Sequence, residues 1–323
     1  MNDIKLASMA AVKDCLGVKA NESVLILTDH TCLNIANSIF KVANDLANEV
    51  YFLQMKERQL SGENPPKEIA ELMKAVDVVF APLSKSITHT DATIDARKAG
   101  VRVATMPGIT EDIFSRCMNV NYNEIAVYTK KVAKLLESKN QVHVKTALGT
   151  DFRFSIKDSK LIESNGLYTE KGSGGNLPTG EVFCAPRENY GTGKLVVDGT
   201  IAGVGLVKNP VTIEIEDGYI INVDASEDGK KLKAILLKFG NKLGSDNQAC
   251  GIAELGIGTN FAAKLSGFLL EDEKAYKTIH IAFGNNKSMG GTNTVESHID
   301  GVILNPDLFV DGEQIMRHGE VLF

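Results

Sequence analysis

The tetrapeptides Val24-Leu25-Ile26-Leu27 and Val50-Tyr51-Phe52-Leu53 decide the fold of the first part of the chain. Each is a short apolar run with the length of a buried strand. Between them, residues 36–46 carry apolar side chains at the three- and four-residue spacing of one helix face. A strand, a helix and a second strand in this order predict a right-handed crossover between parallel strands.

The same alternation continues towards residue 140. Residues 76–81 and 101–104 are two further strand candidates, and a helix over 91–99 between them ends at Gly100. Another helix opens at Asn64-Pro65-Pro66, since proline suits a first helical turn. The sequence therefore predicts an α/β protein with an N-terminal parallel-sheet αβα domain.

The pattern changes after the polar residues 137–140. From there apolar and polar side chains alternate, as at 152–157, and 211–223 has the form of a β-hairpin around Asp217-Gly218. We therefore predict two domains. Residues 1–140 form a Rossmann-like α/β domain, and residues 141–323 form an α+β metal-binding catalytic domain.

Composition excludes several classes of protein. Of 323 residues, 43% are hydrophobic and 24% are charged, and the formal net charge is −6. This balance is typical of a globular protein and gives no basic stripe for nucleic acid. The five cysteines form no CxxC pair, and no apolar run reaches membrane-spanning length. We predict a cytoplasmic protein with reduced thiols and without nucleic-acid or membrane partners.

Polar residues in apolar surroundings mark a candidate metal site in the second domain. His298 and Asp300 are two residues apart, so on a strand both side chains point to one face. His280, Glu254 and Glu181 each interrupt an apolar, glycine-flanked run, where an ionisable group is costly unless it meets a cation or a hydrogen-bond partner. Each alone has a plain structural explanation, but together they predict a shared site. Imidazole and carboxylate ligands suit zinc, cobalt, manganese or ferrous iron.

The other histidines and the glycine run are weaker candidates. His30 and His89 follow strands of the first domain and are interpreted as loop residues, and His143 and His318 as exposed ones. The glycine run at 172–175 lacks the lysine and spacing of a phosphate-binding loop, which predicts a flexible loop. The sequence shows no pattern typical of a Ser/His/Asp or Cys/His catalytic site.

Several segments together resemble the aminopeptidase T/aminopeptidase S family of metallopeptidases, which shares a superfamily with 2,5-dihydroxypyridine dioxygenase. The resemblance spans most of the chain in consistent order. It is carried by Thr88-His89-Thr90-Asp91-Ala92, residues 100–110, Gly149-Thr150-Asp151-Phe152, residues 176–186, residues 253–258, Asp272-Glu273-Lys274, residues 280–284 and His298-Ile299-Asp300.

In the peptidase family two adjacent metal ions are held by two glutamates, two histidines and an aspartate. The resemblance places these ligands at Glu181, Glu254, His280, His298 and Asp300. It implies that a metal-activated water attacks a peptide carbonyl, with Glu181 as base or bridging ligand, in a homodimer that takes small peptides or other small molecules.

One position departs from the family. Lys287 lies where the resemblance calls for a catalytic tyrosine, and we interpret Lys287 as an electrostatic substitute for its hydroxyl. The sequence favours a metal-dependent aminopeptidase with one or two zinc, cobalt or manganese ions. The first alternative is a ring-cleaving dioxygenase with Fe(II) on His280, His298 and Asp300. The second is a catalytically silent metal-binding relative.

Overall fold

The computed structural model describes residues 3–323, which divide into two compact units. Unit 1 contains the residues up to Ala126 and Ser164–Thr179, and unit 2 contains Val127–Glu163 and Gly180–Phe323. The units interleave along the chain, whereas the sequence placed a single boundary near residue 140. That position falls just after helix α6 (Tyr122–Leu136), most of which belongs to unit 2.

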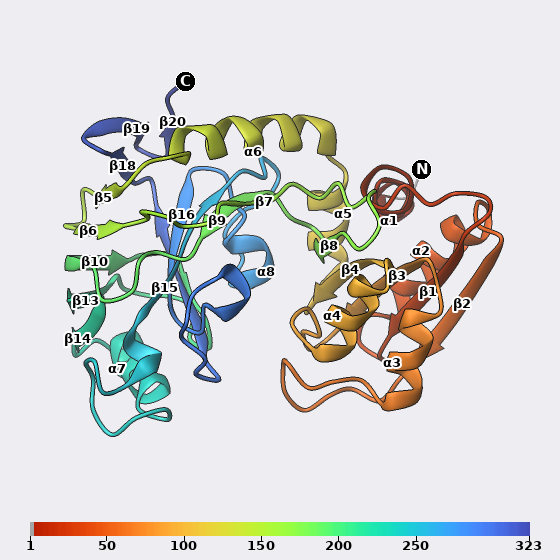
Figure 1. Cartoon of the computed structure of the whole chain (residues 1–323), viewed down its shortest axis with the longest axis horizontal. Helices are drawn as coiled ribbons and strands as arrows, with labels where there is room; N and C mark the ends of the chain where they lie inside the picture. Colours follow the sequence, from red (N-terminus) through yellow and green to blue (C-terminus); the bar gives the residue numbers. More distant parts are fainter. Residues whose placement is uncertain (1–2) are drawn as a thin grey trace. The chain divides into compact units, whose positions relative to one another are not determined.

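Unit 1 is built on a parallel sheet with the strand order β2-β1-β3-β4-β8 (Figure 1). The predicted strands are present with shifts of one to three residues at their ends. The strands are β1 (Ser23–Thr28), β2 (Glu49–Gln54), β3 (Val78–Leu83), β4 (Arg102–Pro107) and β8 (Gly174–Asn176). The helices are α1 (Asp3–Met9), α2 (Leu33–Asn44), α3 (Lys67–Lys74), α4 (Asp91–Lys98) and α5 (Glu111–Met118). A short π-helical segment, Ala10–Cys15, extends α1.

Helices cover the unit 1 sheet in two groups. Helices α3 and α4 contact each other and contribute Met73 and Ala96 to a core with Leu25, Val79 and Val103 of the sheet. Helices α1, α2 and α5 contact one another as a separate group. Alternating strands and helices thus give the predicted αβα arrangement, and the α/β fold class is confirmed.

The glycine run at 172–175 is partly a strand and not the predicted flexible loop. Gly174 and Gly175 lie in β8, which pairs parallel with β4. A Cβ atom at Gly174 would lie 2.3 Å from the carbonyl oxygen of Val103, so only glycine permits this approach. A three-residue strand of two glycines and an asparagine has no apolar period, and the prediction failed for that reason.

Unit 2 contains two antiparallel sheets. The eight-stranded sheet has the order β14-β13-β10-β6-β5-β18-β19-β20. Its strands are β5 (Gln141–Lys145), β6 (Asp151–Ser155), β10 (Thr192–Val197), β13 (Val211–Glu216), β14 (Tyr219–Val223), β18 (Asp307–Val310), β19 (Glu313–Arg317) and β20 (Glu320–Val321). The predicted hairpin over 211–223 is present as β13 and β14, with Asp217 and Gly218 both at positive φ in its turn.

The seven-stranded sheet has the order β12-β11-β17-β16-β15-β9-β7. Its strands are β7 (Ile162–Ser164), β9 (Glu181–Cys184), β11 (Thr200–Ile201), β12 (Gly205–Leu206), β15 (Ile252–Gly258), β16 (Thr278–Gly284) and β17 (His298–Leu304). The remaining helices of unit 2 are α7 (Glu227–Leu236) and α8 (Leu269–Asp272), with short 3-10 turns at Gln248–Cys250 and Lys287–Met289.

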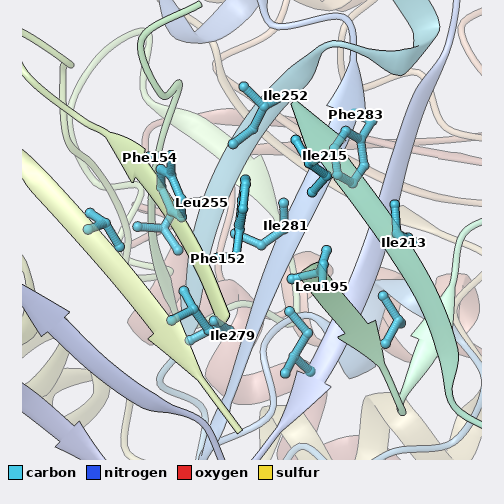
Figure 2. Packing of buried hydrophobic residues seen from close by; sticks show 14 of the residues in the cluster. Phe152, Phe154, Leu195, Ile213, Ile215, Ile252, Leu255, Ile279, Ile281 and Phe283 are labelled. Carbon is cyan, nitrogen blue, oxygen red and sulfur yellow. The ribbon is translucent and has the colours of Figure 1, made fainter. Parts of the chain in front are cut away.

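The two sheets of unit 2 enclose one hydrophobic core (Figure 2). Phe152 and Ile213 come from the eight-stranded sheet, and Leu255, Ile279 and Ile281 come from the seven-stranded sheet. All five residues are at most 2% exposed, so the two inner faces pack against each other and exclude solvent. Among residues 3–323, no helix has both the length and the apolar character that crossing a membrane requires.

Candidate metal centre

Side chains of strands β15 and β16 point alternately to the hydrophobic core and to the candidate site, on opposite faces of the sheet. Leu255 and Ile257 of β15 and Ile279 and Ile281 of β16 belong to the core between the sheets. Because successive side chains of a strand point to opposite faces, His280 faces outward from the sandwich core. The candidate site therefore lies on the outer face of the seven-stranded sheet.

All five predicted ligands lie on this outer face, on four neighbouring strands. Their cross-strand partners are mostly small. Glycines pair with three of the ligands and alanine with the other two; the pairs are Glu181↔Gly258, Glu254↔Ala282, His280↔Gly256, His298↔Gly284 and Asp300↔Ala282. Small neighbours leave room for large polar side chains to reach across the sheet.

Glu254 lies between the two imidazoles. Its Oε1 is 3.2 Å from Nε2 of His280, and its Oε2 is 3.1 Å from Nε2 of His298. Nε2 of His298 is also 3.4 Å from Oδ1 of Asp300. Ligand atoms of Glu254, His280 and Asp300 lie within 4.8 Å of one another, close enough to hold one metal ion.

The hydrogen bond of His298 shows why this arrangement suits a cation. Its Nδ1 lies 2.7 Å from the carbonyl oxygen of Asn285, which can only accept, so the proton is on Nδ1. In the neutral ring, Nε2 then presents a lone pair to the carboxylates of Glu254 and Asp300. That contact is favourable only when a proton or a metal ion lies between the groups. A backbone carbonyl that orients an imidazole in this way is typical of metal-ligating histidines.

Burial differs among the members of the centre. His280 is 1% exposed and Asp300 is 4% exposed, whereas the side chain of His298 is 32% exposed. The centre is therefore closed on the side of His280 and open on the side of His298, where a small molecule could approach.

Glu181 reaches the centre but is shared with a lysine that the sequence analysis did not single out. Its Oε2 is 3.7 Å from Nε2 of His280, and its Oε1 is 3.3 Å from Nζ of Lys274. Lys274 also pairs with Glu273. Lys274 lies in the segment Asp272-Glu273-Lys274, which resembles the peptidase family, but chain order does not reveal which carboxylates a lysine reaches.

Lys287, the predicted electrostatic substitute for a tyrosine, lies at the start of the turn Lys287–Met289 and is exposed. Its backbone N–H donates to Oδ1 of Asn285. The buried cation beside the centre is Lys274 instead. A catalytic role for Lys287 stays a prediction.

The charges of the centre are mutually compensated when no metal is bound. Burial opposes the charge on His280, but the Glu254 carboxylate outweighs burial and raises the pKa of His280 to about 9. Burial also opposes the charge on His298, and Asp300 and Glu254 nevertheless raise its pKa well above the ordinary value. Burial disfavours the charged form of Glu254, yet the two imidazoles hold the pKa of Glu254 well below its usual range. Protons on the imidazoles thus take the place of a cation.

The chain is similar in sequence to enzymes of two kinds. The curated 2,5-dihydroxypyridine 5,6-dioxygenase of Pseudomonas putida is 24% identical over an alignment of 200 residues, covering 58% of this chain and 56% of that protein. Aminopeptidase T of Thermus aquaticus is 25% identical over 287 residues, covering 77% of this chain and 68% of that protein. Aminopeptidase PepS of Streptococcus thermophilus is 20% identical over 294 residues, covering 76% and 68%.

Two solved structures share the fold. The 2,5-dihydroxypyridine dioxygenase of Pseudomonas putida superimposes with a TM-score of 0.83 at 20% identity, covering 100% of this chain and 98% of that one. The aminopeptidase AmpT of Thermus thermophilus gives a TM-score of 0.69 at 18% identity, covering 100% and 99%.

These findings define a two-unit α/β protein with a candidate metal centre, related to enzymes of two kinds. The chain belongs to the NicX family, described as 2,5-dihydroxypyridine 5,6-dioxygenase, which matches residues 7–323. The resemblance to both the aminopeptidases and the dioxygenase is confirmed. The identity of the metal, the homodimer and the cytoplasmic location stay predictions.

Gly256 makes room for the imidazole of His280, and its replacement by alanine should disrupt the centre. A Cβ atom at Gly256 would lie 2.0 Å from Nε2 of His280, so Gly256→Ala must displace the ring. We expect metal affinity to fall by at least about 10-fold, as on loss of a group that orients a ligand. Isothermal titration with Mn²⁺ measures the change. Ile221→Ala, at an exposed position of β14 in the eight-stranded sheet, is the control, and equal affinities in both variants would contradict this role of Gly256.

The pKa of His280 predicts how the metal-free protein responds to pH. A folded-state value of about 9, against an ordinary value of 6.5, means that this group stabilises the fold fully below pH 6.5. The contribution is lost as pH rises through about 9 and amounts to on the order of 1–3 kcal/mol. Urea unfolding of chelator-treated protein should therefore show a falling free energy of unfolding across this window. The exposed His318→Gln variant should show the same decline, and a flat or rising profile would refute the assignment.

Proposed function

We propose that this protein is a mononuclear metal-dependent dioxygenase that opens the ring of a dihydroxypyridine or a closely similar dihydroxylated heteroaromatic substrate. The observation that carries the proposal is the placement of His280, His298 and Asp300 on one face of adjacent strands, in a chain that matches the dioxygenase family over residues 7–323. Ligand atoms of His280 and Asp300 lie within 4.8 Å of each other and of Glu254, and His298 lies 3.4 Å from Asp300. Two imidazoles and one carboxylate leave positions open on an iron ion.

The residues present suit Fe(II) as well as other divalent ions. His280 and His298 supply neutral nitrogen ligands through Nε2, and Asp300 supplies a hard oxygen ligand. When bound, Fe(II) supplies the sites at which dioxygen and a substrate hydroxyl can bind. The open side at His298 admits the substrate, and the closed side at His280 excludes water from the opposite side.

Glu254 has a separate role in this proposal. With His280, His298 and Asp300 as ligands, its carboxylate stands between the two imidazoles without being needed as a fourth ligand. A dihydroxylated ring that binds through an oxygen must lose a hydroxyl proton. Glu254 is placed to accept this proton, because its carboxylate oxygens lie 3.2 and 3.1 Å from Nε2 of His280 and of His298, next to where the substrate would bind. With both imidazoles neutral and bound to a metal, the protons that lower the pKa of Glu254 are absent, which makes its carboxylate a better base.

Aminopeptidase activity, which the sequence favoured, is the second candidate. The curated aminopeptidases support it, since each aligns with three quarters or more of this chain. The five-ligand, two-metal site that such chemistry was predicted to use includes Glu181. Oε1 of Glu181 pairs with the ammonium of Lys274, and Oε2 lies 3.7 Å from Nε2 of His280, so one of its oxygens is left for a metal.

A paired assay separates the two activities. Protein loaded with Fe(II) without oxygen would receive 2,5-dihydroxypyridine and then oxygen, and protein loaded with Co²⁺ or Zn²⁺ would receive unblocked and N-acetylated peptides. We expect oxygen uptake with loss of the aromatic absorbance, and no peptide cleavage. His298→Ala should lower oxygen uptake at least about 100-fold, because even partners of metal ligands contribute about 10–100-fold.

His318→Ala is the matched control for His298→Ala. His318 is exposed, with a side chain that is 77% accessible, and it lies on the eight-stranded sheet side of unit 2 near Asp307. The His318→Ala variant should show the same oxygen uptake as the unaltered protein. Hydrolysis of the unblocked peptide without oxygen uptake by any form would overturn the proposal and favour the aminopeptidase.

A further inference from the structure

The loop over residues 285–297 joins strand β16 to strand β17 and carries the carbonyl oxygen that orients His298. That oxygen belongs to Asn285 and lies 2.7 Å from Nδ1 of His298. The N–H of Asn285 donates to the carbonyl oxygen of Ser297 at 2.7 Å, which ties the two ends of the loop together. A peptide unit is planar, so the direction of the Asn285 carbonyl is set by whatever holds the N–H of Asn286.

Asn286 is buried, whereas most residues of the loop are exposed or half-buried. Its N–H donates to the carbonyl oxygen of Asn293 at 3.2 Å, and Oδ1 of its side chain accepts from the N–H of Asn293 at 2.9 Å. Its own carbonyl oxygen accepts from the N–H groups of Met289 and Gly291. The peptide unit that bears the Asn285 carbonyl is therefore fixed from its N–H side.

The side chain of Asn286 is held from outside the loop by Glu188, which follows strand β9. Oε1 of Glu188 accepts from Nδ2 of Asn286 at 3.2 Å and from the N–H of Thr292 at 2.6 Å. The hydroxyl of Thr292 donates to the other oxygen of Glu188. Gly291 leaves the space that this arrangement needs, because a Cβ atom there would lie 2.1 Å from Cγ of Asn286.

We propose that Asn286, anchored by Glu188, is a positioning residue that sets the orientation of the His298 imidazole towards the metal. The carboxylate of Glu188 holds the amide of Asn286. The peptide unit of Asn286 in turn holds the carbonyl that accepts from Nδ1 of His298. The side chain of His298 is 32% exposed, so packing alone does not fix its ring, and the hydrogen bond at Nδ1 does. Groups that orient a ligating imidazole contribute about 10–100-fold to metal affinity.

The role of Asn286 in metal binding rests on the metal centre of the proposed function, whereas its effect on the imidazole can be measured without metal. In the metal-free protein, the hydrogen bond to Asn285 should give the Nδ1–H of His298 a slowly exchanging NMR signal, identified as the one that His298→Ala removes. A merely structural role of Asn286 would lower thermal stability and leave this signal unchanged. Isothermal titration with Mn²⁺ supplies the second readout.

The experiment compares variants of the full chain with the unaltered protein. Asn286→Ala and Glu188→Ala should each lose the Nδ1–H signal to exchange with solvent and bind Mn²⁺ at least about 10-fold more weakly. Glu188→Gln should keep the signal and the affinity, because its carbonyl can accept from Asn286 and Thr292 while its amide donates to the Thr292 hydroxyl. The control Glu296→Ala removes an equal charge from an exposed position of the same loop and should also keep both.

The outcomes separate the possible failures. A signal that persists in folded Asn286→Ala or Glu188→Ala overturns the positioning role, and so does an unchanged Mn²⁺ affinity in a variant that has lost the signal. If neither alanine variant folds, hydrogen exchange in the unaltered protein decides. Slow exchange at the N–H of Asn286 supports the role, and exchange as fast as at exposed loop residues overturns it. If the unaltered protein binds no Mn²⁺ but the signal responds as expected, the proposed function fails and the effect of Asn286 on the imidazole is supported.

Discussion

The antiparallel register of strands β15, β16 and β17 is the constraint on which the site depends. The same pairing that places Leu255 opposite Ile281 in the core places Gly256 opposite His280 on the outer face. A slip of one residue would turn every side chain of a strand to the other face. The hydrophobic core and the metal ligands are therefore specified by one arrangement, and the apolar contacts between the sheets hold the ligands in place.

That outer face carries a cluster of buried carboxylates whose charges must be compensated. Glu181, Glu254 and Asp300 are each at most 7% exposed, and burial of ionised carboxylates is costly unless they are paired. Without metal, the protons on the two imidazoles and the ammonium of Lys274 supply the compensation. In the proposed function a divalent ion replaces these protons, whereas Lys274 remains.

Sequence patterns predicted much of this structure for physical reasons. Apolar runs of strand length marked β1 and β2, and the alternation around Asp217-Gly218 marked the β13–β14 hairpin. Ionisable residues in apolar, glycine-flanked runs and the two-residue spacing of His298 and Asp300 marked the five predicted ligands. The role of Gly256 could not be predicted, because the clash that it avoids lies across the sheet. The role of Lys274 was not predicted, because one of the two carboxylates that it pairs with, Glu181, is distant in the sequence; the other, Glu273, is its neighbour. Residues 164–179 belong to unit 1 although the chain before and after them belongs to unit 2, and no local sequence pattern predicts this.

The most direct test of the account is a crystal structure of the protein soaked with Mn²⁺ or Fe²⁺, in which anomalous scattering locates the metal. The account predicts one peak on the outer face of the seven-stranded sheet, at about 2 Å from Nε2 of His280, Nε2 of His298 and a carboxylate oxygen of Asp300. A peak that lacks both imidazoles as ligands, or no peak on this face at saturating metal, would contradict it.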